Sequence, residues 1–135
     1  PANDIIRFAS RFDPQPFHID AEAAKETLFG GLCASGWHTT AMWNRSFLSF
    51  WNAECARLES EGIGPPKLGP SPGFRNLRWI RPVFAGDRIT SYVTLTASRD
   101  IPSKPGWFLN TILCEGENQN GEPVIRFEST VLEFT

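Results

Sequence analysis

Apolar residues recur at helical spacing from Ala34 to about Leu58, whereas from Phe74 onward they alternate with polar residues. In the first stretch, one apolar stripe repeats every three or four residues and an aromatic stripe lies on the far side: Ala34, Trp37, Ala41, Leu48, Trp51, Cys55 and Leu58 form the first, and Trp43, Phe47 and Phe50 the second. A helix that is apolar nearly all round is typical of a protein core. The pattern therefore predicts one long helix enclosed by the rest of the chain.

The start of this helix carries its own signals. Residues 29–31, FGG, interrupt the chain just upstream, and Ser35 then stands beside Gly36. We expect the Ser35 hydroxyl to cap the helix and Gly36 to leave the first backbone amides free to meet an anionic oxygen. Ser35 as a nucleophile is disfavoured because the G-x-S-x-G setting is missing. Ser35 and Gly36 are therefore candidate substrate-binding residues.

Two shorter helices are predicted upstream of the long one. Apolar residues recur at helical spacing over 4–12, behind a possible Asn3 cap. The alanine-rich segment 21–29 follows Asp20, whose side chain is suited to cap a helix, and its early glutamate favours a helix start. Both short helices have a purely structural interpretation.

Between these helices, the segment 13–20 reads DPQPFHID. Its two prolines disfavour a regular helix and predict a stiff, extended loop. On such a loop, Asp13 and His18 can point to one side and share a water molecule, so that one accepts a proton while the other donates one. A turn aspartate beside a structural histidine is the alternative interpretation of the same residues. Asp13 and His18 are the candidate catalytic pair.

The second half of the chain has the signals of a β-sheet. A loop rich in proline and glycine follows the long helix, and four stretches with strand patterns follow it, at 74–81, 88–98, 107–116 and 124–134. In the second of these stretches, strict alternation predicts a strand with one buried face. Short helices, one long helix and about four antiparallel strands form an α+β arrangement in which the sheet wraps the helix, which is the hot-dog fold.

Length and charge narrow the possible classes of protein. The 135 residues predict a single domain spanning 1–135 that folds on its own core. A net charge of −2 without a lysine or arginine run argues against nucleic acid as a partner. The apolar runs fall short of the roughly 18 residues that span a bilayer, so we expect no membrane association.

Cysteines and histidines give little support for a metal or a cofactor. The three cysteines, Cys33, Cys55 and Cys114, lack paired metal-ligand spacing and are expected to be buried thiols in a reducing cytoplasm. The two histidines do not belong to a ligand cluster, and His38 is interpreted as a core or dimer-interface residue. The glycines do not form a phosphate-binding loop between a strand and a helix. We therefore expect no metal and no cofactor.

The stretch 8–37 resembles the signature of the MaoC-like dehydratases, a family that includes (R)-specific enoyl-CoA hydratases; it reads FASRFDPQPFHIDAEAAKETLFGGLCASGW. The family has a Gly-Asp-x-Asn-Pro-x-His loop before a glycine-rich entry to the hot-dog helix. The residues that match this signature are Asp13, Pro16, His18, Asp20, Ala24, Phe29, Gly30, Gly31 and Gly36. Further on, LRWIRPVFAGD at 77–87 is similar to the family's strand and turn with Pro-Val and Gly-Asp.

Three positions depart from the family pattern. Phe12 stands where a glycine is usual, Gln15 replaces the asparagine, and Ser35 replaces the histidine of a common Ala-His-Gly. The family's first strand, ahead of the first helix, is also missing from this sequence. We therefore expect a sheet that lacks an edge strand or a chain that has been trimmed.

The resemblance implies a homodimer of hot-dog subunits, an acyl thioester substrate carried on coenzyme A or a carrier protein, and catalysis by Asp13 with His18. The expected reaction adds water to, or removes it from, the double bond next to the thioester. Two alternatives stay open at this point. One is a thioesterase on the same fold, and the other is a non-catalytic subunit that binds acyl chains or supports a partner.

Overall fold

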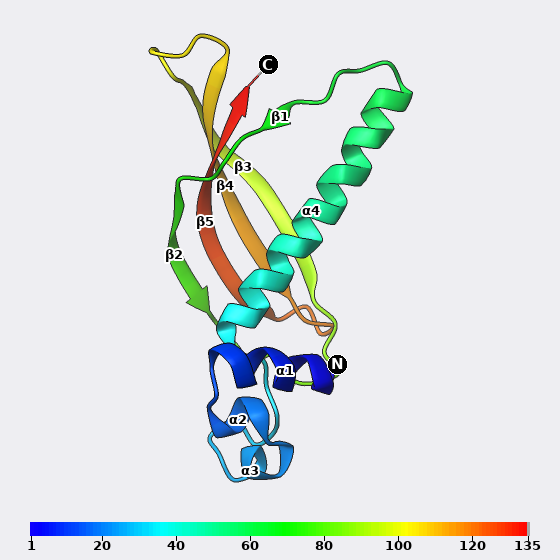
Figure 1. Cartoon of the computed structure of the whole chain (residues 1–135), viewed down its shortest axis with the longest axis vertical. Helices are drawn as coiled ribbons and strands as arrows, with labels where there is room; N and C mark the ends of the chain where they lie inside the picture. Colours follow the sequence, from blue (N-terminus) through cyan, green and yellow to red (C-terminus); the bar gives the residue numbers. More distant parts are fainter. Residues whose placement is uncertain (135) are drawn as a thin grey trace.

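A computed structural model describes residues 1–134, in which four helices are followed by five strands (Figure 1). The helices are α1 (Ala2–Phe12), α2 (Pro16–Ile19), α3 (Ala21–Lys25) and α4 (Gly36–Ser60). The strands are β1 (Lys67–Leu68), β2 (Gly73–Trp79), β3 (Thr90–Asp100), β4 (Trp107–Glu117) and β5 (Pro123–Phe134). A long helix against an antiparallel sheet confirms the predicted α+β hot-dog fold.

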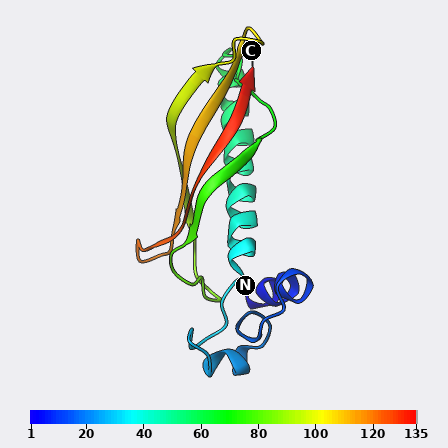
Figure 2. The ribbon, with the colours of Figure 1, turned by 90° about the vertical axis from the view of Figure 1, so that its left-hand side faces the viewer.

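The sheet is built around its last strand. β5 pairs with β4 along its whole length on one side, and with β2 and then β1 on the other, and all of these pairings are antiparallel. β4 pairs in turn with β3, which forms the outer edge. The sheet curves around the side on which α4 lies (Figure 2). The strand bounds agree with the predicted ones, and the only strand in the predicted loop is the two-residue β1.

α4 packs on the sheet through its aromatic stripe. Trp43 is buried in a cluster with Phe127 and Ile125 of β5, and the half-buried Phe47 packs against this cluster. The indole N–H of Trp43 also donates to the carbonyl of Glu115, at 2.9 Å. Apolar burial of this kind stabilises the contact between helix and sheet by roughly 25 cal/mol per Å² of buried surface.

The prediction that the rest of the chain encloses α4 is wrong for the single subunit. The other apolar stripe is at most half-buried, with Trp37 51% and Leu48 47% exposed, and Phe50 on the far half of the helix is 54% exposed. Figure 1 shows that α4 runs at an angle to the strands, so that its far half extends away from the sheet. The helical period correctly located the apolar residues, but it does not say which element covers them.

The prediction that one face of β3 is buried is also wrong for the single subunit, as far as residues 1–134 describe it. Val93 is 37% and Leu95 62% exposed, and β3 is the edge strand of the sheet. The accessible surface of the whole subunit is 8741 Å², whereas a monomer of its mass typically exposes about 7,100 Å². The exposed apolar side chains of α4 and β3 are part of this large surface.

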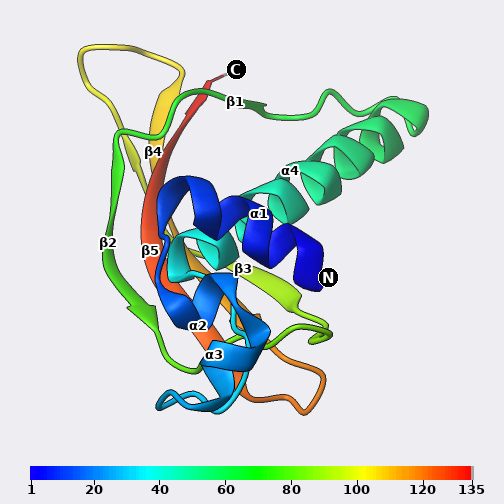
Figure 3. The same cartoon turned by 60° about the horizontal axis from the view of Figure 1, so that its bottom comes forward.

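The three short helices gather at the first turns of α4 (Figure 3). Asp20 caps α3 as predicted, because its carboxylate accepts from the amides of Glu22 and Ala23. The Asn3 cap is wrong, since α1 begins one residue after Pro1 and Asn3 lies within its first turn. A buried cluster of Ile5, Ala24 and Leu32 joins these helices to the chain that leads into α4.

The segment 13–20 is not the extended loop that the prolines predict. Residues Pro16–Ile19 form the helical turn α2, with Pro16 at its first position. A proline is tolerated there because the first amide of a helix has no intrahelical partner to lose. His18 therefore projects from a helix, whereas Asp13 lies at the end of α1.

Candidate active site

The start of α4 is held between two distant parts of the chain. The amide of Cys33 donates to the carbonyl of Phe17 at 3.0 Å, and the amide of Ala34 donates to the carbonyl of Val83 at 2.7 Å. These bonds fix the entry of the helix against α2 on one side and against the β2–β3 connection on the other. The residues at the start of α4 consequently lie next to side chains from the end of α1 and from α2.

Asp13 and His18 meet at this entry. The distance between Nε2 of His18 and Oδ2 of Asp13 is 3.5 Å, and the His18 side chain is only 8% exposed. The other ring nitrogen, Nδ1, lies 2.7 Å from the carbonyl oxygen of Cys33. A carbonyl accepts only, so Nδ1 carries a proton, and in the neutral ring Nε2 is then an acceptor that faces Asp13.

Both oxygens of the Asp13 carboxylate already accept hydrogen bonds. The side-chain amide of Gln15 donates to Oδ1 at 2.6 Å, and the hydroxyl of Ser35 donates to Oδ2 at 2.7 Å. The Ser35 cap is therefore wrong: Ser35 stands at the N-cap position of α4, but its hydroxyl bonds Asp13 instead of a helix amide. In a cap the hydroxyl oxygen would accept from a helix N–H, whereas here the hydroxyl donates its proton to an ionised carboxylate, and charge-assisted hydrogen bonds of this kind are the stronger ones.

Opposing effects set the acidity of Asp13. Burial raises the pKa of this carboxyl group, but the hydrogen bonds from Gln15 and Ser35 and the nearby His18 together bring the pKa below its usual value. Asp13 is consequently ionised at neutral pH and acts as an acceptor of protons and hydrogen bonds.

Gly36 lies under an indole ring. A Cβ at this position would overlap the ring of Trp79 from β2, and this ring contacts Trp37 edge to face with centroids 4.9 Å apart. The indole N–H of Trp79 donates to Thr40 at 3.1 Å, which fixes the ring across the first turn of α4. Glycine is therefore required here by a close approach of the backbone to an aromatic side chain.

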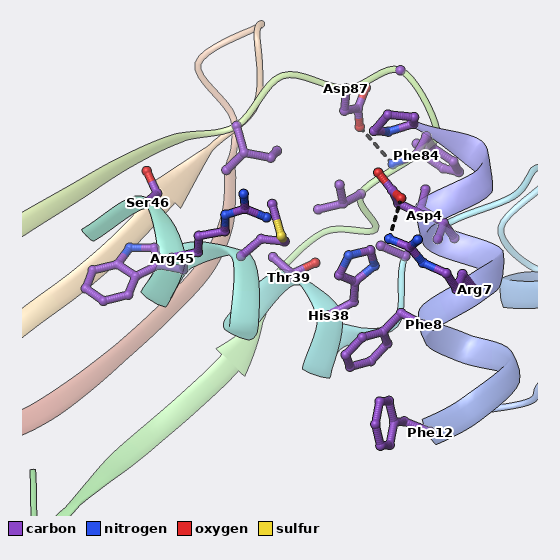
Figure 4. A pocket seen from close by; sticks show the side chains of 18 of the residues that line it. Asp4, Arg7, Phe8, Phe12, His38, Thr39, Arg45, Ser46, Phe84 and Asp87 are labelled. Carbon is purple, nitrogen blue, oxygen red and sulfur yellow. Dashed lines mark hydrogen bonds and ion pairs between the residues drawn. The ribbon is translucent and has the colours of Figure 1, made fainter. Parts of the chain in front are cut away.

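A cleft of about 570 Å³ opens beside this entry, between α1, the first half of α4 and the β2–β3 connection (Figure 4). Phe12 and Ala34, the neighbours of Asp13 and Ser35, line the cleft, but Asp13 and His18 do not. In it, the ring of His38 stacks on that of Phe8 with centroids 4.7 Å apart. Burial lowers the pKa of His38, which favours a neutral packed imidazole over a charged one.

Comparison with known proteins places the chain in a family. Residues 2–106 match the family model described as the MaoC like domain. The chain belongs to the MaoC-like dehydratase family. It is 31% identical over 130 residues to the uncharacterized protein YdeM of Bacillus subtilis, with 96% of this chain and 83% of that protein covered.

Solved structures agree with this family. The MaoC-like dehydratase from Rhodospirillum rubrum has a TM-score of 0.81 and 36% identity, and the match covers 98% of this chain and 83% of that one. An (R)-hydratase from A. caviae involved in PHA biosynthesis has a TM-score of 0.67, with 96% and 85% of the two chains covered. Its identity is 23%, so this second likeness concerns the fold.

Two features of this MaoC-like chain escape sequence reasoning. Trp79 reaches Gly36 across 43 positions in sequence, and a strand pattern gives no sign of that contact. The Cys33 carbonyl that orients His18 is a backbone group, which any residue type supplies. The Cys33 thiol lies 3.8 Å from the same ring nitrogen, but burial raises its pKa, which argues against a thiolate nucleophile.

Metal sites and membrane spans were also expected to be missing. In the described residues, His, Cys, Asp and Glu do not form any group of three or more that could hold a metal ion. Over the same 134 residues, every helix is too short or too polar to cross a bilayer.

Proposed function

We propose that this protein is a hydro-lyase that adds water to, or removes it from, the 2,3 double bond of an acyl thioester. The observation that carries the proposal is the pair of acceptors at 3.5 Å, Oδ2 of Asp13 and Nε2 of His18. Two atoms at this separation can each lie within hydrogen-bond distance of one water beside them. Membership of the MaoC-like dehydratase family supports this chemistry.

In the proposed hydration step, the shared water donates one hydrogen to Asp13 and the other to His18, which leaves an oxygen lone pair free for attack. As the water oxygen bonds to C3, the π electrons move onto the thioester oxygen and one water proton moves to Nε2 of His18. Imidazole is the stronger base of the two groups, and the ionised Asp13 stabilises the resulting imidazolium. Nε2 then returns this proton to C2, which completes the addition of one water.

The thioester oxygen becomes negative during this step and needs hydrogen-bond donors. The first amides of α4, beginning with Gly36, are the proposed donors, because the first turn of a helix has free N–H groups and a positive end. Removing one such donor from an enzyme typically costs about 10² to 10³ in rate. The Ser35 hydroxyl bonds Asp13, so at this position we assign the substrate contact to Gly36 alone.

We propose in addition that a second copy of the chain covers the exposed surface of α4 and β3. The accessible surface of the subunit exceeds that of a typical monomer by about 1,600 Å². This excess is in the range of the area that one subunit buries in an obligate dimer. Tyr92, Val93 and Leu95 on β3 expose apolar side chains next to free edge groups of the sheet, which suit pairing with another strand.

A panel of enoyl thioesters of graded chain length tests the proposed reaction. Loss of the enoyl absorbance measures hydration, and a thiol reagent added to the same wells measures hydrolysis. We expect absorbance loss without thiol release. Thiol release with the enoyl group intact would instead assign a thioesterase, and thioester binding without turnover of any chain length would assign a non-catalytic acyl-binding subunit.

A further inference from the structure

Two of the three departures from the family pattern converge on one carboxylate. Gln15, in place of asparagine, donates to Oδ1 of Asp13 at 2.6 Å, and Ser35, in place of histidine, donates to Oδ2 at 2.7 Å. The two residues come from different elements, the turn before α2 and the N-cap of α4. Each oxygen of the carboxylate thus has its own donor.

We propose that Ser35 and Gln15 are positioning residues that hold Asp13 in one orientation as an ionised acceptor and direct a free lone pair of Oδ2 toward the water that it shares with His18. This inference rests on the proposed function, since the shared water is the nucleophile of that reaction. It assigns to Ser35 a role through Asp13, where sequence reasoning expects a contact with the substrate.

The geometry of the hydroxyl supports this role. Ser35 is fully buried, at 0% exposure, and its single proton is given to Oδ2. A serine hydroxyl has one donor, so the same hydrogen does not serve a thioester oxygen at the same time. Oδ2 has two lone pairs, of which Ser35 takes one. The other is left for a water on the side of His18, whose Nε2 lies 3.5 Å away.

The charge of Asp13 depends on the same donors. Burial raises the pKa of this carboxyl group, and Gln15, Ser35 and His18 act against it. His18 on α2 is the titratable group that faces the carboxylate within the described chain, whereas the Cys33 thiol faces His18. Removing a donor leaves the burial effect less opposed, so the pKa of Asp13 should rise.

Loss of the Ser35 donor should change the pKa of Asp13 and the rate more than loss of the Gln15 donor. Ser35 is buried, whereas Gln15 is exposed and water can replace its amide at Oδ1. A hydrogen bond to a charged group typically changes an equilibrium by about tenfold to a hundredfold when it is removed. We therefore expect the full effect for Ser35→Ala and a smaller one for Gln15→Ala.

The test combines a titration with kinetics. The carboxyl carbon of Asp13 is followed by NMR in protein labelled with ¹³C-aspartate, and its signal is assigned with Asp13→Asn. For Ser35→Ala we expect a higher pKa of Asp13, an acid limb of kcat/KM displaced to higher pH, and a kcat lowered about tenfold to a hundredfold at little change in KM. Ser35→Thr keeps the hydroxyl and should restore both the titration and the rate.

The matched control is Ser49→Ala, which removes an exposed hydroxyl from the same helix and should change none of these values. An unchanged Asp13 titration in Ser35→Ala would overturn the proposal, as would a raised KM at constant kcat, which is the sign of a lost substrate contact. If the wild type hydrates no thioester, the proposed function fails, and the NMR titration still decides the role of Ser35. If Ser35→Ala does not fold, the titration of Asp13 is measured in Ser35→Thr and in Gln15→Ala instead. We expect the pKa of Asp13 to equal that of the wild type in Ser35→Thr and to be raised in Gln15→Ala. An unchanged pKa of Asp13 in Gln15→Ala would count against the proposal.

Discussion

The two ends of α4 differ in what surrounds them. At the first turns, Ser35, Thr39 and Trp43 are buried, and the Ser35 hydroxyl and the Trp43 indole donate to partners at 2.7 and 2.9 Å. On the far half, Phe50 is 54% exposed, and Arg57 finds its ion pairs on its own helix, with Glu54 and Glu61. Surface ion pairs within a helix contribute at most about 0.5 kcal/mol each.

The difference shows that a single chain buries only the first end of its central helix. The first end is a polar site built by non-local hydrogen bonds, which a single subunit supplies. The far end and the β3 edge expose apolar side chains, and each Å² of apolar surface left in water is unfavourable by roughly 25 cal/mol. Changes at the first end should therefore affect chemistry and subunit stability, whereas changes at the far end and at β3 should affect association.

The largest effect is expected at the catalytic pair. Asp13→Asn and His18→Ala should each lower the hydration rate by about 10² to 10⁴, because each removes one of the two acceptors that hold the water. The double variant should lose much less than the product of the two, since both residues act on the same water. Steady-state rates at pH 7 measure the effect, with circular dichroism as the check of folding. Full activity in either folded single variant would exclude that residue from the mechanism.

Trp43→Ala should have the largest effect on subunit stability. It removes a buried indole and its hydrogen bond to Glu115, and truncation of a core aromatic residue costs about 3 to 5 kcal/mol in the free energy of unfolding. Phe50→Ala is the matched control on the same helix. In monomeric protein its cost should be about 1 kcal/mol or less, because more than half of the residue's surface is already in water. Urea denaturation of both variants checks the difference, and equal costs would contradict the assignment of the core.

Leu95→Lys tests the second copy. This residue is 62% exposed in the single subunit, so a lysine should leave the folded subunit intact but place a charge within the proposed interface. We expect the dissociation constant of the dimer to rise at least tenfold, as measured by light scattering after size exclusion over a dilution series. Leu28→Lys, at an even more exposed leucine far from β3, is the control. A wild type that is monomeric at every concentration would refute the proposed dimer.

Gly36→Ala should have an intermediate effect at the first end. The new methyl group would overlap the Trp79 ring and displace it, and overpacking of this kind costs about 1 to 3 kcal/mol. Thermal unfolding measures the loss. Combining Gly36→Ala with Trp79→Ala should relieve the overlap, so the double variant should be more stable than the sum of the two single losses indicates. Simple additivity would mean that the ring is not the obstacle.

The smallest expected effect concerns pH. The pKa of Asp13 is lowered in the folded chain, so its ionised form contributes stability above the pKa of an unfolded aspartate, about 3.9, and this contribution is lost as pH falls through the folded value. Asp13→Asn removes this dependence. Compared with the wild type at pH 7 and pH 3 by urea denaturation, the variant should lose less stability on acidification. Parallel losses in both proteins would show that Asp13 is not favoured in its charged form.

Sequence reasoning was most successful where the signal is local. The helix at 34–58 and the four main strands follow from periods of 3.6 and 2, and their observed bounds differ by a few residues. The resemblance singled out Asp13 and His18, which the structure brings to 3.5 Å. Their catalytic role stays a prediction, as does the substrate contact of Gly36.

Two expectations about single residues failed for different reasons. Pro16 begins a helical turn, where a proline is tolerated for a local reason. The hydroxyl of Ser35 bonds Asp13, which is distant in sequence, so its partner does not follow from the residues beside it. An apolar stripe reports that a face avoids water, but the same hydrophobic effect is satisfied by a sheet or by a second subunit. The sequence by itself thus determined which segments are helix and strand and which residues are apolar. Only the tertiary structure decided which of them meet, because hydrogen bonds and packing join residues through space, independently of their separation along the chain.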